Sequence, residues 1–177
     1  MTRRTLVLGG ARSGKSAHAE GLLADAAAVT YVATARRDPQ DQEWAARIAA
    51  HVDRRPPSWR TVETTDVAAL LDALGPADPP VLIDDAATWL TGVLDDCGAW
   101  EGAGLDEVAA RCGALVASVA RCRSRVALVS AEVGLGVIPA TRSGRLFRDQ
   151  LGSLNARLAE VCDEVLLLVA GLPLRLR

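Results

Sequence analysis

The chain has 177 residues, of which 50% are hydrophobic and 24% charged, with a formal net charge of −2. This composition predicts one globular domain over residues 1–177, large enough to bury a hydrophobic core. It argues against a nucleic-acid partner, because no strongly basic surface is available to hold a phosphate backbone.

The first residues show no targeting segment. The apolar run 6–8 is too short for a signal peptide and leads directly into glycines. No stretch approaches the ~18 apolar residues of a membrane span. The four cysteines form no C-x-x-C pair, so buried side chains are expected rather than a disulfide framework or a zinc site. We therefore expect a cytoplasmic protein without membrane insertion.

Short apolar runs alternate with helix-like segments along the chain. Strands are expected at Thr5–Gly9, Val29–Ala33, Trp59–Glu63, Val81–Asp84, Arg125–Ser130 and Glu164–Val169. Helices are expected at Lys15–Ala27, Gln42–His51, Asp66–Leu74, Thr88–Leu94, Leu105–Cys122 and Ser143–Val161. The alternation predicts an α/β fold, with a mainly parallel sheet covered by helices on both faces. After the last strand, residues 171–173 are expected to turn into a short tail.

A phosphate-binding loop follows the first predicted strand. It matches G-x-x-x-x-G-K-[ST] and consists of Gly9, Gly10, Ala11, Arg12, Ser13, Gly14, Lys15 and Ser16. Lys15 is the only lysine among the 20 Lys and Arg residues. Its compact ammonium on a flexible stem can reach between the β- and γ-phosphates of a nucleotide, whereas the glycines turn backbone N–H groups toward phosphate oxygens.

The loop also predicts a magnesium site. The Ser16 hydroxyl is a candidate ligand of Mg²⁺, and Asp84 ends the apolar strand 81–84, as the Walker B carboxylate of P-loop proteins does. Asp85 is adjacent and points the other way if the strand continues. The alternative is that one of the two acids only caps the following helix.

His51 is a candidate nucleophile within the segment 43–63. The neighbouring Arg54 and Arg55 can stabilise phosphate charge, and imidazole can attack a phosphoryl centre. A structural or solvated histidine is the competing interpretation. The other histidine, His18, lies in the first helix and has no such surroundings.

The segment 130–139 follows an apolar strand, as functional loops at a sheet edge do. Its two glycines around a single apolar residue suggest a loop that lies against a ligand or a partner. A plain surface loop is the competing interpretation, and the residues alone favour it.

Taken together, these segments resemble the bifunctional adenosylcobinamide kinase/adenosylcobinamide-phosphate guanylyltransferase family. The resemblance covers almost the whole chain. It rests on the phosphate-binding loop, above all Gly10-Ala11-Arg12, and on four further blocks of sequence. These blocks are Tyr31-Val32-Ala33-Thr34, the series Arg47-Ile48, His51, Arg55-Pro56 and Trp59-Arg60-Thr61, the segment 132–139, and the C-terminal series Phe147-Arg148-Asp149, Gly152, Asn155 and Asp163 to Pro173.

The resemblance implies a RecA-like P-loop domain that assembles as a trimer. It implies phosphorylation of adenosylcobinamide by ATP or GTP, followed by transfer of GMP from GTP to adenosylcobinamide phosphate, with Mg²⁺ as cofactor. His51 would carry the GMP covalently. The guanine nucleotide site would be lined by Thr34, Ala35, Arg36, Arg54, Arg55 and Glu63.

The chain departs from this family at three places, and rival functions remain. Ala50 stands where some relatives have a second histidine, and Ala156 where glutamine is common. In the tail, Arg175 and Arg177 stand where lysine is frequent. The rivals are a kinase for another small alcohol or nucleotide with a structural His51, a RecA-like nucleic-acid-binding ATPase, and a regulatory nucleotide-binding module without catalysis.

Overall fold

The structure is a computed structural model, which describes residues 3–36 and 56–177. The helix predicted over 42–51 and the residues His51, Arg54 and Arg55 lie outside the described residues.

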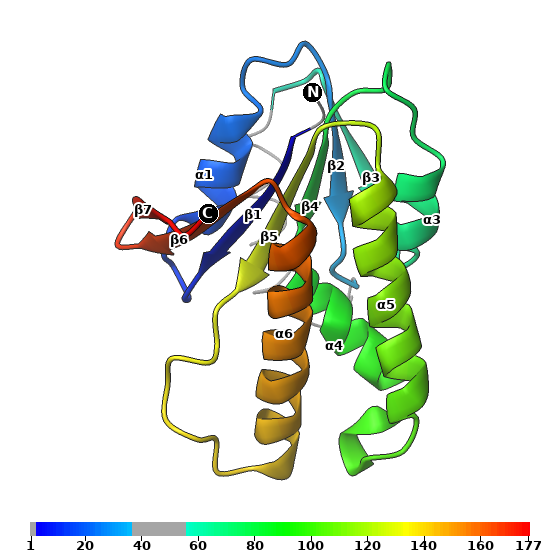
Figure 1. Cartoon of the computed structure of the whole chain (residues 1–177), viewed down its shortest axis with the longest axis vertical. Helices are drawn as coiled ribbons and strands as arrows, with labels where there is room; N and C mark the ends of the chain where they lie inside the picture. Colours follow the sequence, from blue (N-terminus) through cyan, green and yellow to red (C-terminus); the bar gives the residue numbers. More distant parts are fainter. Residues whose placement is uncertain (1–2, 37–55) are drawn as a thin grey trace.

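A seven-stranded sheet forms the centre of the described structure (Figure 1). Its strands are β1 (Arg4–Gly9), β2 (Val29–Ala33), β3 (Trp59–Glu63), β4 (Val81–Asp84), β5 (Val126–Ala131), β6 (Glu164–Val169) and β7 (Leu172–Arg175). They are arranged in the order β3-β2-β4-β5-β1-β6-β7, and every neighbouring pair is parallel except β6 and β7. The carboxyl ends of six strands therefore meet at one edge of the sheet.

The described helices cover the two faces unequally. They are α1 (Lys15–Leu22), α3 (Val67–Asp72), α4 (Ala86–Asp96), α5 (Leu105–Arg121) and α6 (Arg142–Val161), with a 3₁₀ turn at Ala99–Glu101. Helix α1 packs its buried Ala19 against Val7 and Leu82 on one face. Helices α3 to α6 contribute to a larger core on the other face, which includes Leu90 and Leu115. Parallel strands buried on both sides are apolar along their whole length, which explains the short continuous runs of the sequence.

Side-chain caps start three of these helices. Asp66, Asp85 and Thr141 each accept a hydrogen bond from a backbone N–H in the first turn of α3, α4 and α6, respectively. These bonds satisfy backbone donors that would otherwise have no partner within the helix. The helix predicted to start at Asp66 is thus observed as α3, with Asp66 as its cap.

The predicted α/β fold with a mainly parallel sheet is confirmed, but α1 is shorter than expected and ends at Leu22. Its alanine-rich continuation favours a helix, yet the chain turns back there to enter β2. Arg125, at the start of β5, donates to the carbonyl of Leu22 and pairs with Asp25 at 2.9 Å. This long-range contact holds the helix end in place and has no counterpart in local sequence.

The tail also differs from the expectation, because residues 172–175 form β7. Ala170 and Gly171 both have positive φ, of 52° and 81°, as in the two-residue turns that join antiparallel strands. Backbone pairing with β6 then turns the tail into an edge strand.

Candidate functional site

The phosphate-binding loop leads from β1 into α1, as the sequence predicts. Gly14 has φ 89°, a left-handed conformation that favours glycine, and α1 begins at Lys15. No side chain of the described residues caps this helix start. Its N–H groups and the positive end of its dipole are therefore available to an anion. Lys15 Nζ donates to the carbonyl of Gly10 at 3.3 Å, which places the ammonium over the loop.

The base of the loop is packed closely against β6 and the turn that follows it. A Cβ at Gly9 would overlap Ser13 Oγ and lie 3.0 Å from the carbonyl oxygen of Leu168, so any larger residue would displace the loop. The N–H of Gly171 donates to the carbonyl of Ser13 at 3.0 Å. Gly9 thus allows the loop to pack closely against β6, and the β6–β7 turn holds the loop through a backbone hydrogen bond.

Asp84 lies at the end of β4 and faces the first turn of α1. Ser16 Oγ donates to Asp84 Oδ1 at 3.2 Å, so the hydroxyl and the carboxylate predicted to act together are brought into contact. Both side chains are half-buried. A hydroxyl and a carboxylate are hard oxygen ligands of the kind that bind Mg²⁺ in nucleotide sites, where phosphates and water complete the coordination. These residues therefore fit the metal.

Asp85 has a different role, since its carboxylate accepts from the N–H of Thr88 at 2.6 Å and caps α4. Burial raises the pKa of Asp85. Thr34 ties this turn to the end of β2: its hydroxyl donates to the carbonyl of Asp85 at 2.8 Å and accepts from the N–H of Asp85 at 3.0 Å. Of the two acids, Asp84 is the one that faces the loop.

Sheet register brings several predicted site residues to one level. Ala33 pairs with Glu63 on one side and with Asp84 on the other. The end of β2 therefore lies between Glu63 and Asp84, and Thr34 and Ala35 follow directly after it. Glu63 is exposed, whereas Thr34 is buried. The predicted nucleotide-binding residues of this region thus share one edge of the sheet, although their contact with a nucleotide stays a prediction.

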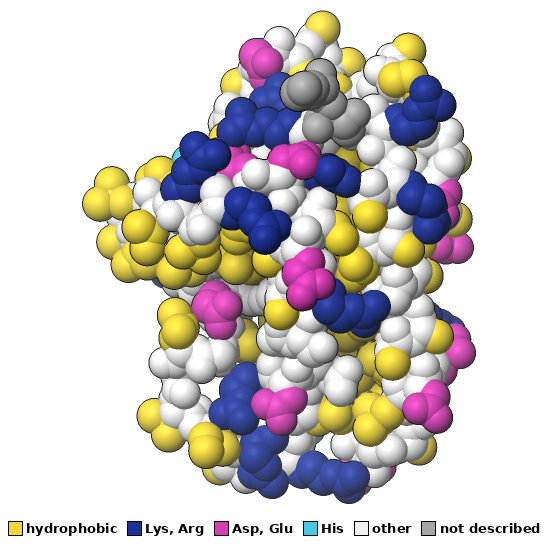
Figure 2. All heavy atoms as spheres, viewed as in Figure 1, with side chains coloured by type: hydrophobic (Ala, Val, Ile, Leu, Met, Phe, Trp, Pro, Cys, Tyr) yellow, Lys and Arg dark blue, Asp and Glu magenta, His cyan; other side chains and the backbone are white. Residues whose placement is uncertain are grey.

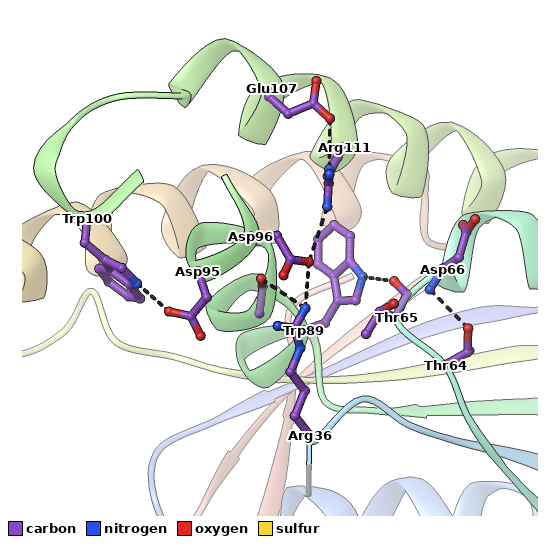
Figure 3. A network of polar contacts seen from close by, with 11 residues as sticks. Arg36, Thr64, Thr65, Asp66, Trp89, Asp95, Asp96, Trp100, Glu107 and Arg111 are labelled. Carbon is purple, nitrogen blue, oxygen red and sulfur yellow. Dashed lines mark hydrogen bonds and ion pairs between the residues drawn. The ribbon is translucent and has the colours of Figure 1, made fainter. Parts of the chain in front are cut away.

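Arg36 points toward Asp96 of α4 (Figure 3). Its guanidinium pairs with Asp96 at 2.6 Å, and Arg111 of α5 approaches the same carboxylate oxygen at 3.5 Å. The hydrogen bond from Arg36 is the main reason why the pKa of Asp96 is lowered. The assignment of Arg36 to the nucleotide site is therefore still a prediction, and in this structure its charge is matched by α4.

A cavity of about 350 Å³ adjoins Arg36 and Thr34 on the α4–α5 side. Trp89 lines it and donates its indole N–H to the carbonyl of Thr65 at 3.0 Å. The remaining polar groups include Asp66, Asp96 and Arg111, so the cavity is lined by both hydrogen-bond donors and acceptors (Figure 3).

The loop after β5 contacts the phosphate-binding loop. The N–H of Glu132 donates to the carbonyl of Gly9 at 3.1 Å, and Glu132 Oε1 accepts from the N–H of Gly134 at 2.6 Å. Beyond this point the loop exposes Leu135, Val137 and Ile138, with Val137 93% exposed. The segment is therefore more than a plain surface loop at its start, and its apolar tip faces solvent in the single chain.

Within residues 3–36 and 56–177, no cluster of three or more His, Cys, Asp or Glu side chains could hold a metal ion. In the same part of the chain, no helix is both long and apolar enough to cross a bilayer. Three of the four cysteines, Cys112, Cys122 and Cys162, are buried, and all four are free thiols.

The contact between Tyr31 and Asp84 was not predicted. Tyr31 of β2 donates its hydroxyl to Asp84 Oδ2 at 2.6 Å. Side-chain alternation along β2 would place Tyr31 on the same face as Asp84 only if β2 pairs with β4. This pairing cannot be read from the sequence.

The strand order, the glycine loop and the paired Ser16 and Asp84 define a P-loop nucleotide-binding protein. Solved structures support this fold. An ATPase from the type III secretion system of pathogenic bacteria matches with a TM-score of 0.60 at 10% identity, covering 93% of this chain and 50% of that one. The P4 protein of bacteriophage phi6 in complex with ADP matches with a TM-score of 0.50 at 13% identity, covering 97% and 52%. The chain thus spans about half the length of each.

Sequence comparison is more specific. The family model for cobinamide kinase/cobinamide phosphate guanyltransferase matches residues 5–176, and the chain belongs to this family. It is 40% identical to the bifunctional adenosylcobalamin biosynthesis protein CobU of Salmonella typhimurium, over 97% of this chain and 98% of that protein. It is 41% identical to the corresponding protein CobP of Pseudomonas aeruginosa, over 98% and 97%. The resemblance noted from the sequence motifs is confirmed.

Proposed function

We propose that residues 1–177 form one transferase domain with two activities. It phosphorylates adenosylcobinamide with ATP or GTP, and it then transfers GMP from GTP to adenosylcobinamide phosphate. The observation that carries the proposal is the contact between Ser16 and Asp84 beside an open glycine loop with Lys15, in a chain of this family. We place the activity in the cytoplasm, where nucleoside triphosphates are available.

In the kinase reaction, the substrate hydroxyl attacks the γ-phosphorus. A new O–P bond forms, the bond from the γ-phosphorus to the bridging oxygen breaks, the hydroxyl proton passes to solvent, and the nucleoside diphosphate leaves. Lys15 and the N–H groups at the start of α1 stabilise the charge on the leaving oxygens, so positioning and electrostatics account for most of the acceleration. Ser16 and Asp84 would hold Mg²⁺, which would neutralise phosphate charge.

In the guanylyl transfer, the neutral imidazole of His51 attacks the α-phosphorus of GTP. A nitrogen–phosphorus bond forms and pyrophosphate leaves. A phosphate oxygen of adenosylcobinamide phosphate then displaces the histidine, which gives adenosylcobinamide-GDP. Arg54, Arg55 and Glu63 are proposed to contact the guanine nucleotide. Two successive displacements predict ping-pong kinetics for this half-reaction.

Labelling tests the nucleophile. The full-length protein is incubated with Mg²⁺ and GTP labelled at the α-phosphate, and acid-labile, alkali-stable label on the chain is measured. The native chain should take up label, and His51→Ala should take up none. His18→Ala is the matched control, because it removes the only other histidine, and it should label normally.

The outcomes separate the competing functions. Label on His51→Ala would show that the nucleophile is wrongly assigned. Absence of label from the native chain, with kinase activity intact, would favour a kinase with a structural His51. Salt-dependent binding to single-stranded DNA would favour a nucleic-acid-dependent ATPase, and nucleotide binding without turnover of either substrate would favour a regulatory module.

We also propose that the chain forms a homo-oligomer, a trimer by family resemblance. Exposed apolar side chains support this proposal. They gather over the β6–β7 hairpin, where Figure 2 shows a continuous hydrophobic area, and at the tip of the loop after β5. Leu172 of β7 is 73% exposed. Contiguous apolar patches of this kind mark protein interfaces.

A further inference from the structure

Tyr31 is the only tyrosine of the chain, and it joins the hydrophobic core to the phosphate-binding edge. The residue is 2% exposed and belongs to the core layer between the sheet and α1, together with Val7 and Leu82. Its hydroxyl donates to Asp84 Oδ2 at 2.6 Å. A buried ring therefore presents one polar atom to the carboxylate that faces the phosphate-binding loop.

The sheet register explains why the two side chains meet. Tyr31 pairs with Leu82 and Ala33 pairs with Asp84 across β2 and β4. Tyr31 and Asp84 are thus diagonal neighbours on the same face, a separation that a long aromatic side chain can bridge. The aromatic ring cannot shift easily, because it is almost fully buried in this core.

The carboxylate of Asp84 is consequently held by two hydroxyls from different elements. Tyr31 of β2 contacts Oδ2, and Ser16 of α1 contacts Oδ1 at 3.2 Å. Hydrogen bonds to a charged acceptor are short and strong, and the Tyr31 bond is the shorter of the two. One oxygen is fixed from the core side, whereas the other lies next to the serine of the phosphate-binding loop.

We infer that Tyr31 is a positioning residue for the nucleotide-bound divalent cation. Its hydroxyl fixes the rotation of the Asp84 carboxylate through Oδ2, so that Oδ1 is presented to the metal together with Ser16. Tyr31 acts through Asp84 and does not itself contact the cation. The inference rests on the proposed function, in which Asp84 and Ser16 hold Mg²⁺.

The substitution Tyr31→Phe removes only the hydroxyl and keeps the ring. The carboxylate then rotates more freely. Each binding event must restrict this rotation, and this restriction lowers the affinity for the cation. The loss of one hydrogen bond to a charged group predicts an affinity for the cation that is about tenfold lower. The affinity for nucleotide in the absence of metal should stay within about twofold, since the loop amides and Lys15 are unchanged.

The test uses the full-length protein, Mn²⁺ as the probe and β,γ-imido-GTP as a nucleotide that is not turned over. Free Mn²⁺ is measured by electron paramagnetic resonance, and metal-free nucleotide affinity is measured in EDTA. Thr5→Val is the matched control, because it removes another buried hydroxyl that donates to a carboxylate, Glu164 at 3.4 Å, near the amino-terminal ends of the strands. It should leave both affinities unchanged.

A double-mutant cycle with Asp84→Asn identifies the path of the effect. Tyr31→Phe should weaken Mn²⁺ binding in the native background and have no further effect in the Asp84→Asn background. Native Mn²⁺ affinity in Tyr31→Phe, or an equal loss in metal-free nucleotide binding, overturns the inference. If Asp84→Asn itself leaves Mn²⁺ binding unchanged, the metal assignment of the proposed function fails as well. If only Tyr31→Phe is without effect, that assignment stands and the positioning role alone is wrong.

Near-ultraviolet circular dichroism and urea unfolding are run on each variant. Because phenylalanine preserves the packed ring, we expect Tyr31→Phe to unfold in one cooperative transition like the native chain. A variant that has lost its tertiary signal would lose metal-free nucleotide binding too, and that result would count against a specific positioning role.

Discussion

At the residue scale, the most informative side chain is Lys15. Every other Lys or Arg position carries a guanidinium, so the ammonium is kept only where the backbone of the loop closes around it. Its Nζ already lies 3.3 Å from the carbonyl of Gly10, and α1 begins at the same residue. A single residue thus combines the charge, the reach and the helix start that phosphate binding needs.

The substitution Lys15→Arg should therefore impair both activities. The larger planar guanidinium does not fit over the loop as the ammonium does, and we expect kcat/KM to fall about 100-fold or more in each half-reaction. Steady-state assays of kinase and guanylyl transfer measure the effect. The reverse exchange at an exposed site, Arg60→Lys, serves as control and should be neutral. Native rates in Lys15→Arg would contradict the role of the ammonium.

At the element scale, an ion pair between Arg4 and Asp163 attaches the start of β1 to the start of β6. Arg4 donates through its guanidinium to both oxygens of Asp163, and its backbone N–H donates to Asp163 Oδ2 at 2.8 Å. The N–H of Asp163 returns a bond to the carbonyl of Arg4 at 2.8 Å. The hydrogen bond from Arg4 lowers the pKa of Asp163.

This pair predicts a pH-dependent stability. An aspartate whose pKa is lower in the folded state stabilises the fold above its unfolded pKa of about 3.9, and this contribution is lost as the pH falls through the folded value. Asp163→Asn should lower the free energy of unfolding by about 0.5–1 kcal/mol at pH 7, a small value because the carboxylate is partly exposed.

Urea unfolding at pH 7 and at pH 3 measures this effect. The difference between the native chain and Asp163→Asn should be full at pH 7 and should shrink at pH 3. A difference that is independent of pH would show that the backbone bonds, rather than the charge, join the two strands.

At the scale of the whole molecule, one edge of the sheet exposes apolar side chains. Strand β7 is an exposed edge strand, and Leu172 and Leu174 lie on it with more than half of their surface exposed. An apolar edge of this kind favours association with another chain. The β6–β7 turn also contacts the phosphate-binding loop through Gly171 and Ser13, so the proposed oligomeric surface and the loop are neighbours.

Replacing both leucines by glutamate, in Leu172→Glu/Leu174→Glu, should convert the proposed oligomer into a monomer. Two charges would have to be buried without partners at the interface. Size-exclusion chromatography with light scattering gives the mass directly. Ala110→Glu on the exposed side of α5 is the control and should keep the native mass. A native chain that is monomeric at tens of micromolar would disprove association through this surface.

Local chemistry was sufficient to predict the loop, the helix that follows it and the acid at the end of the fourth strand. Glycine spacing, an apolar strand and a lysine act within a few residues of one another, so the sequence alone determined Gly9 to Ser16 and the candidate Asp84. The sheet with its alternating helices was predictable for the same reason, since buried strands are apolar along their length.

Only the tertiary structure decided what depends on strand order. The pairing of β2 with β4 places Tyr31 on Asp84, and the separation between these residues is 53 positions in the chain. The same holds for the contact of Arg125 with the end of α1 and for the ion pair between Arg36 and Asp96. Strand pairing and ion pairs between distant segments depend on the packing of the entire core, so no local pattern encodes them.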